Sequence, residues 1–318
     1  FYLCYIIYLI MKKYSNLIII IITFIFLILI LFNREIVSYT IINSFNIWFN
    51  TLVPSMFPMF ILSDILINYN FIEYIPNKIS NIISKIFNIN KASVLILFIS
   101  ILSGFPGNAN ALLEAYNLKL ISKEEVEHLL LFNHFPNPLF VIYTVGALYL
   151  NNSKLGIIIL TNIYLSNLII GIIYRKNNHP TNINYISNIS KSQSFITVFT
   201  TSIKKSINTL LMISGTVTSF LVISTLLCYI LNINSITSAI IKGILEMTMG
   251  LNSLSNININ INIKLILSSI FIAFGSISIH MQIISILKDI SYLKYLKGRL
   301  LSTLVIVLLS ILTTIFFF

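Results

Sequence analysis

The sequence predicts an all-α polytopic membrane protein with about eight membrane segments, built as an inverted repeat that contains broken or re-entrant helices. Composition is the first reason: 57% of the residues are hydrophobic and only 9% are charged, with a mean hydropathy of +0.94, whereas about a quarter of the residues of a soluble domain are charged. Length is the second, since 318 residues are enough for about eight segments of roughly 20 residues. The third is that small or helix-breaking residues interrupt one apolar segment in each half of the chain.

The first half of the chain contains apolar runs separated by short polar pieces. Pro54 and Pro58 should kink the second run, since proline lacks a backbone N–H. Ser122 followed by two glutamates is typical of a helix N-cap and an acidic first turn. The expected elements are Ser15–Phe32, Phe45–Asn68, the amphipathic piece Ile75–Phe87, the broken segment Ala92–Asn117, and the spans Leu129–Leu150 and Leu155–Tyr174.

The second half repeats this pattern after a polar stretch. Its alternation of Asn and Ile at residues 256–263 is of low complexity and predicts a loop. The expected elements are Ile207–Leu231, the shorter apolar piece Ile236–Leu251, the second broken segment Leu265–Leu287 and the closing span Leu300–Phe318.

Four parts of the chain follow from this reading. Met11 followed by two lysines and an apolar run is typical of the start of a membrane protein, so we expect residues 1–10 to be an upstream extension. Residues 11–174 then form the first repeat with a leading helix, residues 175–205 a polar cytoplasmic loop, and residues 206–318 the second repeat.

The basic residues lie between the apolar runs. The net charge of +11 is therefore explained by the excess of Lys and Arg in cytoplasmic loops, and no nucleic-acid partner is expected. Basic residues after the second broken segment should also be cytoplasmic, which favours a full crossing by Leu265–Leu287. The residues that set this orientation are Lys12, Lys13, Arg175, Lys176, Lys191, Lys204, Lys205, Lys288, Lys294, Lys297 and Arg299.

Polar and helix-breaking residues within the apolar segments predict a central binding site. Irregular backbone at membrane depth is tolerated only where protein buries it or where it lines a polar cavity. The alternatives are a close helix–helix contact through small residues, or an interfacial helix cap in the case of residues 133–138. The predicted substrate-binding residues are Gly104, Phe105, Pro106, Gly107, Asn108, Asn133, His134, Asn137, Glu246, Gly275, Ser276, Ser278, His280 and Gln282.

Acidic residues are rare enough to be informative. Glu246 lies in an apolar context where ionisation is costly, so it is expected to bind a coupling proton or cation, to pair with His280, or to mark an interfacial helix end. Asp64 and Glu114 resemble it but lie nearer the expected helix ends.

Several classes of function lack residue support. The four histidines have no zinc-site spacing, and Cys4 and Cys228 are far apart in apolar surroundings. Phosphate-binding, dinucleotide-binding and nucleophile-elbow motifs are absent from the sequence. We therefore expect no enzymatic activity, no metal and no cofactor.

Several motifs, in order along the chain, resemble the YlbJ (SpoVV) family of sporulation integral membrane proteins from endospore-forming Firmicutes. One departure is Asn110, which stands where the family frequently has Lys. The motifs that support the resemblance are Leu102–Ala109, Glu125–Asn133, Asn137–Phe140, Gly243–Gly250, Phe274–Gln282 and Lys297–Leu301.

The resemblance implies a nucleoside-recognition or gate-domain protein with the architecture of concentrative nucleoside transporters. It further implies transport of dipicolinic acid from the mother cell across the outer forespore membrane. Helix N-termini at the breaks and the amides of Asn108, Asn133 and Asn137 suit a small anion in the bilayer, and a homo-oligomer is compatible with the sequence. A nucleoside or ion transporter of the same architecture and a non-transporting sporulation scaffold stay open. A scaffold should tolerate loss of the polar residues at the breaks, whereas a transporter should not.

Overall fold

The computed structural model describes residues 2–69, 71–175 and 194–317, and in these ranges it is helical, without strands. The predicted all-α membrane class is confirmed. Five helices in this part of the chain are long and apolar enough to cross a membrane, or six if one bent pair counts as a span, so the expected number of about eight is not confirmed. The five are Arg34–Asn68, Ser153–Tyr174, Phe195–Ile230, Ile261–Ile286 and Tyr292–Phe316.

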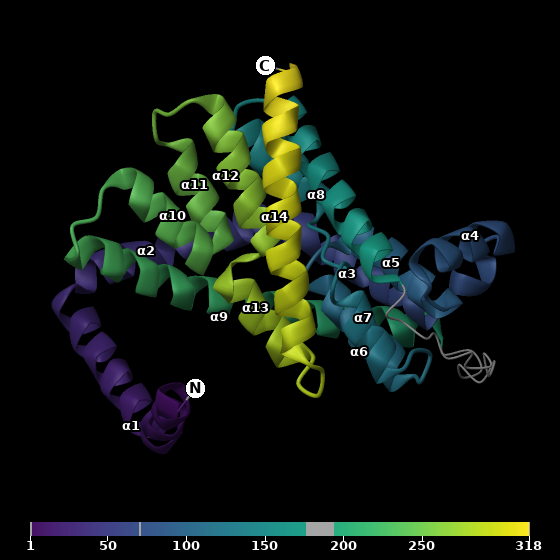
Figure 1. Ribbon diagram of the computed structural model, residues 1–318, viewed down its shortest axis with the longest axis horizontal. Helices are drawn as coiled ribbons and strands as arrows, with labels where there is room; N and C mark the ends of the chain where they lie inside the picture. The colour runs from purple at the N-terminus through teal and green to yellow at the C-terminus, as the bar shows by residue number, and fades with distance from the viewer. Residues whose placement is uncertain (1, 70, 176–193, 318) are drawn as a thin grey trace.

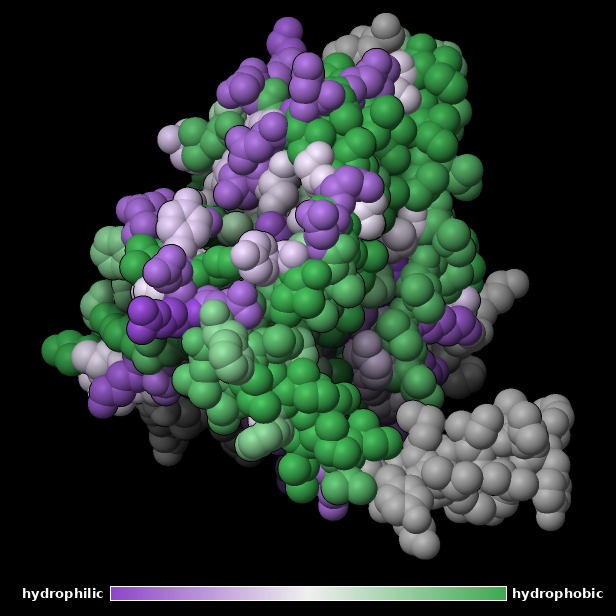
Figure 2. Space-filling model, turned by 90° about the vertical axis from the view of Figure 1, so that its left-hand side faces the viewer, coloured by the Kyte–Doolittle hydropathy of each residue, from purple (hydrophilic) through white to green (hydrophobic). Residues whose placement is uncertain are grey.

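The surface is that of a protein surrounded by lipid. Hydrophobic side chains cover large parts of the face drawn in Figure 2, while hydrophilic ones gather mainly toward its upper and left parts. The closing helix α14 (Tyr292–Phe317) has one apolar exposed stripe at helical spacing, formed by Leu304, Leu308, Leu312 and Ile315. Its opposite stripe is buried and partly polar, and consists of Arg299, Ser302, Ile306 and Ser310. A helix with this division faces hydrocarbon on one side and the protein interior on the other.

The N-terminal helices are longer than the sequence predicts. Helix α1 (Tyr2–Phe32) extends away from the other helices and runs through the residues expected to be an upstream extension (Figure 1). Helix α2 (Arg34–Ile47), a π-helical turn (Trp48–Leu52) and α3 (Val53–Asn68) form the next span. The π turn lies just before the two prolines, where missing N–H groups leave carbonyls without their usual partners.

The amphipathic piece and the first break are confirmed as features of the fold. A 3₁₀ turn (Phe71–Tyr74) precedes α4 (Asn77–Phe87), which meets α5 (Lys91–Ser103) at an angle of 90°. Helix α5 ends before Gly104. Helix α6 (Gly107–Asn117) begins after Pro106 and packs against α5. We call α5 and α6 the first helix pair. At 1.5 Å per residue each spans about 20 Å or less, too short to cross the bilayer alone.

The predicted span Leu129–Leu150 is wrong. Helix α7 (Lys123–Leu129) begins after Ser122, whose Oγ accepts a hydrogen bond from Glu125 N at 3.2 Å, which confirms the predicted N-cap. Residues 130–137 are irregular, because Pro136 and Pro138 cannot donate helical hydrogen bonds. We call this stretch the first interruption. A π-helix, η3 (Phe140–Tyr149), and α8 (Ser153–Tyr174) follow.

Two further boundaries differ from the sequence prediction. Helix α9 (Phe195–Ile230) begins inside the stretch expected to be a cytoplasmic loop, while residues 176–193 of that loop lie outside the described residues. The predicted single piece Ile236–Leu251 is two helices, α10 (Ser235–Leu245) and α11 (Met247–Ser255), which separate at Glu246 and pack against each other. We call α10 and α11 the second helix pair.

The second predicted break lies inside one candidate span. Helix α12 (Ile261–Phe274) ends at Gly275, which has φ +83°, and α13 (Ser276–Ile286) follows at once. Residues 261–286 count together as one membrane-length segment, in line with the favoured crossing. We call Gly275 and Ser276 the second interruption.

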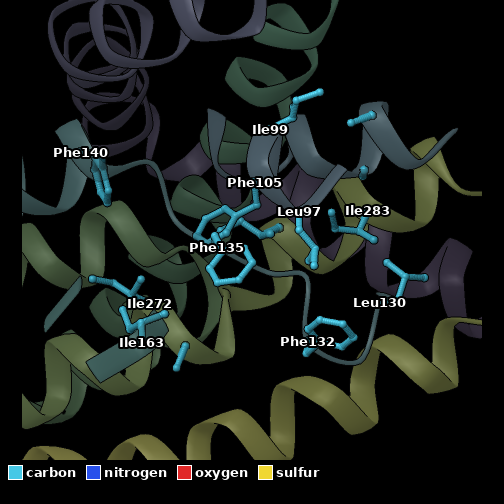
Figure 3. Close-up of a cluster of buried hydrophobic side chains, with 14 of the residues drawn as sticks. Leu97, Ile99, Phe105, Leu130, Phe132, Phe135, Phe140, Ile163, Ile272 and Ile283 are labelled. Atoms are coloured by element: carbon cyan, nitrogen blue, oxygen red, sulfur yellow. The ribbon is translucent and has the colours of Figure 1, made fainter. Parts of the chain in front are cut away.

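Apart from the 3₁₀ turn and α4, which have no counterpart in the second half, the element order after α3 recurs after α9. A helix pair, an interrupted helix and a closing helix follow in each half: α5–α6, α7–η3 and α8, then α10–α11, α12–α13 and α14. The halves pack together through α3 with α9, α6 with α13, and α8 with both α12 and α14 (Figure 1). The buried core lies between them, and Phe105, Phe135 and Ile272 of this core come from different elements (Figure 3).

Candidate functional site

The first helix pair meets the first interruption at its break. Gly104 has φ +72°, and a Cβ atom at this position would lie 2.3 Å from Asn137 N, so only glycine fits. Phe105 N donates to Phe135 O at 2.9 Å, and the Asn137 amide donates to Ser103 O at 3.3 Å. Phe105 and Phe135 lie next to each other on the non-helical segments (Figure 3). The break and the interruption thus form one unit.

Asn108 and Asn137 strengthen this unit. The Asn108 amide, in the first turn of α6, donates to Asn133 O. Asn137 also donates to Ser55 O of α3 at 3.1 Å, and its Oδ1 accepts from Phe140 N at 3.2 Å at the start of η3. Hydrogen bonds therefore join the predicted site residues at the break between α5 and α6 to those of the first interruption.

His134 connects the two halves. Its ring stacks on Phe105 with 4.2 Å between ring centroids, and its Nδ1 lies 3.2 Å from the hydroxyl of Tyr295 in α14. Gly275 faces the same ring, since a Cβ atom on Gly275 would lie 2.8 Å from His134 Nε2. The first helix pair and both interruptions therefore meet at this fully buried histidine.

Arg299 of α14 lies beside this meeting point, although the sequence predicts that it faces the cytoplasm. It is 0% exposed. Its guanidinium donates to Ala273 O at 3.3 Å, Leu131 O at 3.2 Å and Asn167 Oδ1 at 3.3 Å. Ala273 is in the last turn of α12 and Leu131 just follows α7, so one side chain binds the C-terminal ends of both interrupted helices. We call Arg299, Asn167, Tyr295 and His134 the central cluster.

The central cluster has a buried cation without an acidic partner. In the described part of the chain the salt bridges join Lys205 to Asp64 and Glu114, and the partners of Arg299 are neutral oxygens. Carbonyls at helix C-termini offset part of the charge. An uncompensated buried charge nevertheless costs several kcal/mol. Arg299 is thus a buried positive charge whose side-chain partners are all neutral oxygens.

Several unpaired polar atoms belong to the two interruptions and to the central cluster. Buried polar atoms nearly always have hydrogen-bond partners in proteins, yet five here have none from the protein. These atoms are Nδ2 and Oδ1 of Asn133, Nε2 of His134, Oγ of Ser276 and Nε of Arg299. Donors and acceptors of this kind can bind a small polar solute.

His280 and Gln282 of α13 hold the second interruption in place. The His280 ring bonds Phe274 O at 2.9 Å and the Tyr292 hydroxyl at 2.8 Å, and its centroid lies 4.9 Å from that of Tyr295. Gln282 donates to Thr216 Oγ1 of α9 at 2.7 Å and lies 3.4 Å from Ser278 Oγ. These predicted site residues therefore border the central cluster.

Glu246 does not pair with His280. Its carboxylate accepts a hydrogen bond from Met249 N at 2.8 Å and caps α11, while the partners of His280 are those given above. The backbone of Glu246 is extended, with φ −143° and ψ 111°, and this residue separates α10 from α11. Glu246 therefore forms the tip of the second helix pair, the position that Gly104–Pro106 occupy in the first.

Helix α7, which leads into the first interruption and lies outside the candidate spans, contains two buried titratable groups. Glu125 Oε1 accepts from Asn90 N at 2.7 Å and from Ser93 Oγ at 2.5 Å, which ties α7 to the start of α5. Burial raises the pKa of Glu125, although these two hydrogen bonds act in the opposite direction. Burial lowers the pKa of His128 to about 4, so this histidine is neutral at pH 7.

The sequence did not indicate Arg299, Asn167 or Tyr295. The signal was present for Asn167, which lies at the buried centre of the apolar helix α8. The sequence places Arg299 at the cytoplasmic border of a span expected to start at Leu300, whereas α14 starts at Tyr292. Across residues 2–69, 71–175 and 194–317 no three His, Cys, Asp or Glu side chains gather in a metal-binding group.

Comparison with known proteins gives one informative match. No family model matches the chain, and no solved structure matches it. The chain is similar to the sporulation integral membrane protein YlbJ of Bacillus subtilis (strain 168), with 23% identity over 295 residues that cover 80% of this chain and 72% of that protein. The match spans most of both chains and confirms the resemblance that the motifs support: the chain is an integral membrane protein related to YlbJ.

Proposed function

We propose that the chain is a membrane transporter that moves a small organic anion through the central cluster. Dipicolinic acid, carried from the mother cell across the outer forespore membrane during sporulation, is the substrate that the relationship to YlbJ favours. The observation that supports transport of an anion is the buried guanidinium of Arg299, which has no acidic partner and lies where both interrupted helices end. The proposed role is not enzymatic.

The chemistry of the site suits a carboxylate. Guanidinium groups bind carboxylates through paired, charge-assisted hydrogen bonds, and Nε of Arg299 has no protein partner. The Asn133 amide and Ser276 hydroxyl supply further donors. Dipicolinate is a flat pyridine ring with two carboxylates, and the aromatic rings of Phe105, His134 and Tyr295 offer flat surfaces beside these donors.

The fold suits movement of a solute. Non-helical backbone at membrane depth is tolerated where it lines a site between repeated halves. Here the interruptions belong to different halves, and hydrogen bonds and ring contacts around one histidine and one arginine join them. Such contacts can be exchanged when one half moves against the other.

Uptake of labelled dipicolinate by liposomes that contain the purified full chain tests the proposal. We expect uptake above that of protein-free liposomes, with competition by unlabelled dipicolinate and none by uridine. Uptake of uridine instead would identify a nucleoside transporter of the same architecture. Correctly inserted protein that moves neither compound, nor an inorganic ion, would contradict transport and favour the membrane scaffold.

A further inference from the structure

A cavity of about 510 Å³ lies between α3, α6 and α9, separate from the central cluster. Ligand-binding cavities commonly have volumes of about 300–1,000 Å³. Its walls combine charged groups with amides and apolar side chains. Lining residues that matter for the argument are Phe60, Asp64, Gly107, Asn110, Glu114 and Lys205.

One helix separates this cavity from the central cluster. Gly107, Asn110, Ala111 and Glu114 line the cavity from one face of α6, at the spacing of successive helical turns. On another face of the same first turn, Asn108 donates to Asn133 O, next to His134. Phe60 of α3 packs directly against Gly107, since a Cβ atom on Gly107 would lie 2.7 Å from the Phe60 ring.

Lys205 joins the walls of the cavity. Its ammonium lies 3.0 Å from Asp64 Oδ1 of α3 and 2.7 Å from Glu114 Oε2 of α6, so a residue of the second half holds two elements of the first. Ser202 fixes the other oxygen of Asp64 at 2.6 Å. The Lys205 side chain is nevertheless 45% exposed. One cation thus faces two carboxylates at the mouth of a cavity.

We propose that this cavity is the site where the transported anion first binds, and that Lys205 receives its carboxylate in exchange for Asp64 and Glu114. The proposal rests on the proposed function, since it names the route by which the anion reaches the central cluster. The ligand class is a small carboxylate.

Lys205 is the member of this ion-pair group that a solute can reach. Its side chain is 45% exposed, whereas those of Asp64 and Glu114 are 13% and 22% exposed. The lysine stem is flexible and its ammonium can turn between acceptors. Asp64 and Glu114 keep Lys205 in place but repel an arriving anion, so they should limit its binding. Asn110, which donates to Thr209 Oγ1 at 3.1 Å, adds an amide beside the ammonium.

The charge pattern of the sequence is consistent with entry of the anion at this cavity. Lys204 and Lys205 precede a long apolar run in α9, and their charge predicts that this end of the helix is cytoplasmic. An anion leaving the cytoplasm of the mother cell would meet this cavity before the central cluster.

Substitutions of the three charged residues should have opposite effects on uptake of labelled dipicolinate by liposomes. Glu114→Gln removes a repulsive charge and should lower the KM by about fivefold, the effect of one unit charge near 4 Å in a water-like medium. Asp64→Asn should act in the same direction. Lys205→Met should remove most of the uptake, and Lys205→Arg should restore part of it.

Neighbouring charges provide matched controls. Lys204→Met removes one positive charge, as Lys205→Met does, at the neighbouring exposed position. Glu124→Gln removes one negative charge, as Glu114→Gln does, at an exposed position of α7. Both should leave the KM unchanged. A gain of affinity in Glu114→Gln cannot result from misfolding. Equal loss of uptake in all three cavity variants would show that the ion pairs only stabilise the fold. An unchanged KM in Lys205→Met would also overturn the proposal. Wild-type protein without any dipicolinate uptake would instead refute the proposed function itself.

Discussion

Gly275 and His134 lie in different halves of the chain, yet a Cβ atom on Gly275 would lie 2.8 Å from His134 Nε2. Gly275 also has φ +83°, which favours glycine. The contact brings the second interruption directly against the first. It depends on the absence of one side-chain carbon, so the smallest substitution should disturb it.

Gly275→Ala should therefore impair function more than folding. The strained backbone and the contact with His134 together should cost about 1–3 kcal/mol, and uptake of labelled dipicolinate should fall at least severalfold. Gly215→Ala is the matched control, because nothing lies within 4 Å of a Cβ atom there. Equal uptake by the two variants would contradict a tight junction between the halves.

Replacement of Gly104 and Gly107 together by Leu should abolish uptake while the chain still inserts in the membrane. A Cβ atom would meet Asn137 N at 2.3 Å at the first position and the Phe60 ring at 2.7 Å at the second, so the break and the first interruption must separate. Membrane fractionation and liposome uptake measure the two effects. Normal dipicolinate content in spores that depend on this double variant would show that the break does not form the site.

Glu246→Gln tests the tip of the second helix pair. Glutamine keeps the size of the side chain and an oxygen that can cap Met249 N, so insertion and thermal stability should change little. If the carboxylate couples transport to a proton or a cation, uptake should fall to a small fraction and lose its pH dependence. Full uptake across the pH range would mean that Glu246 acts only as a helix cap.

Acid should destabilise the protein through His128. The pKa of this residue is lowered to about 4 by burial, against an ordinary value of 6.5, so unfolding takes up a proton between these values. The stabilisation is complete above about pH 6.5 and is lost as the pH falls toward 4, by up to about 3 kcal/mol. Glu125, whose pKa is raised, acts in the opposite direction. Thermal unfolding of the purified protein should show a smaller decrease between pH 7 and pH 5 in His128→Gln than in the wild type.

The sequence predicts the breaks in the first half well, because Gly104, Pro106, Pro136 and Pro138 cannot continue a helix whatever surrounds them. It does not predict the break at Glu246. That segment contains no proline, and the separation of α10 from α11 accompanies their packing, in which Gly250 approaches Gly243. Local propensity contains no information on such a contact.

The burial of Arg299 in the site likewise could not be predicted from the sequence. A basic residue before an apolar run usually marks the membrane border. Arg299 is buried instead because α14 begins at Tyr292, about two helical turns before it. Its acceptors Leu131, Asn167 and Ala273 come from distant elements. Only the assembled fold reveals that the charge is buried.

Equilibrium binding of labelled dipicolinate to the purified protein tests most directly whether Arg299 forms the anion site. We expect saturable binding by the wild type, loss of at least tenfold in affinity in Arg299→Gln, in keeping with the few kcal/mol that a charge-assisted pair contributes, and partial retention in Arg299→Lys. Lys297→Gln makes the same charge change two residues earlier at an exposed position and should bind as the wild type does. Folded Arg299→Gln protein that binds dipicolinate with wild-type affinity would contradict the account.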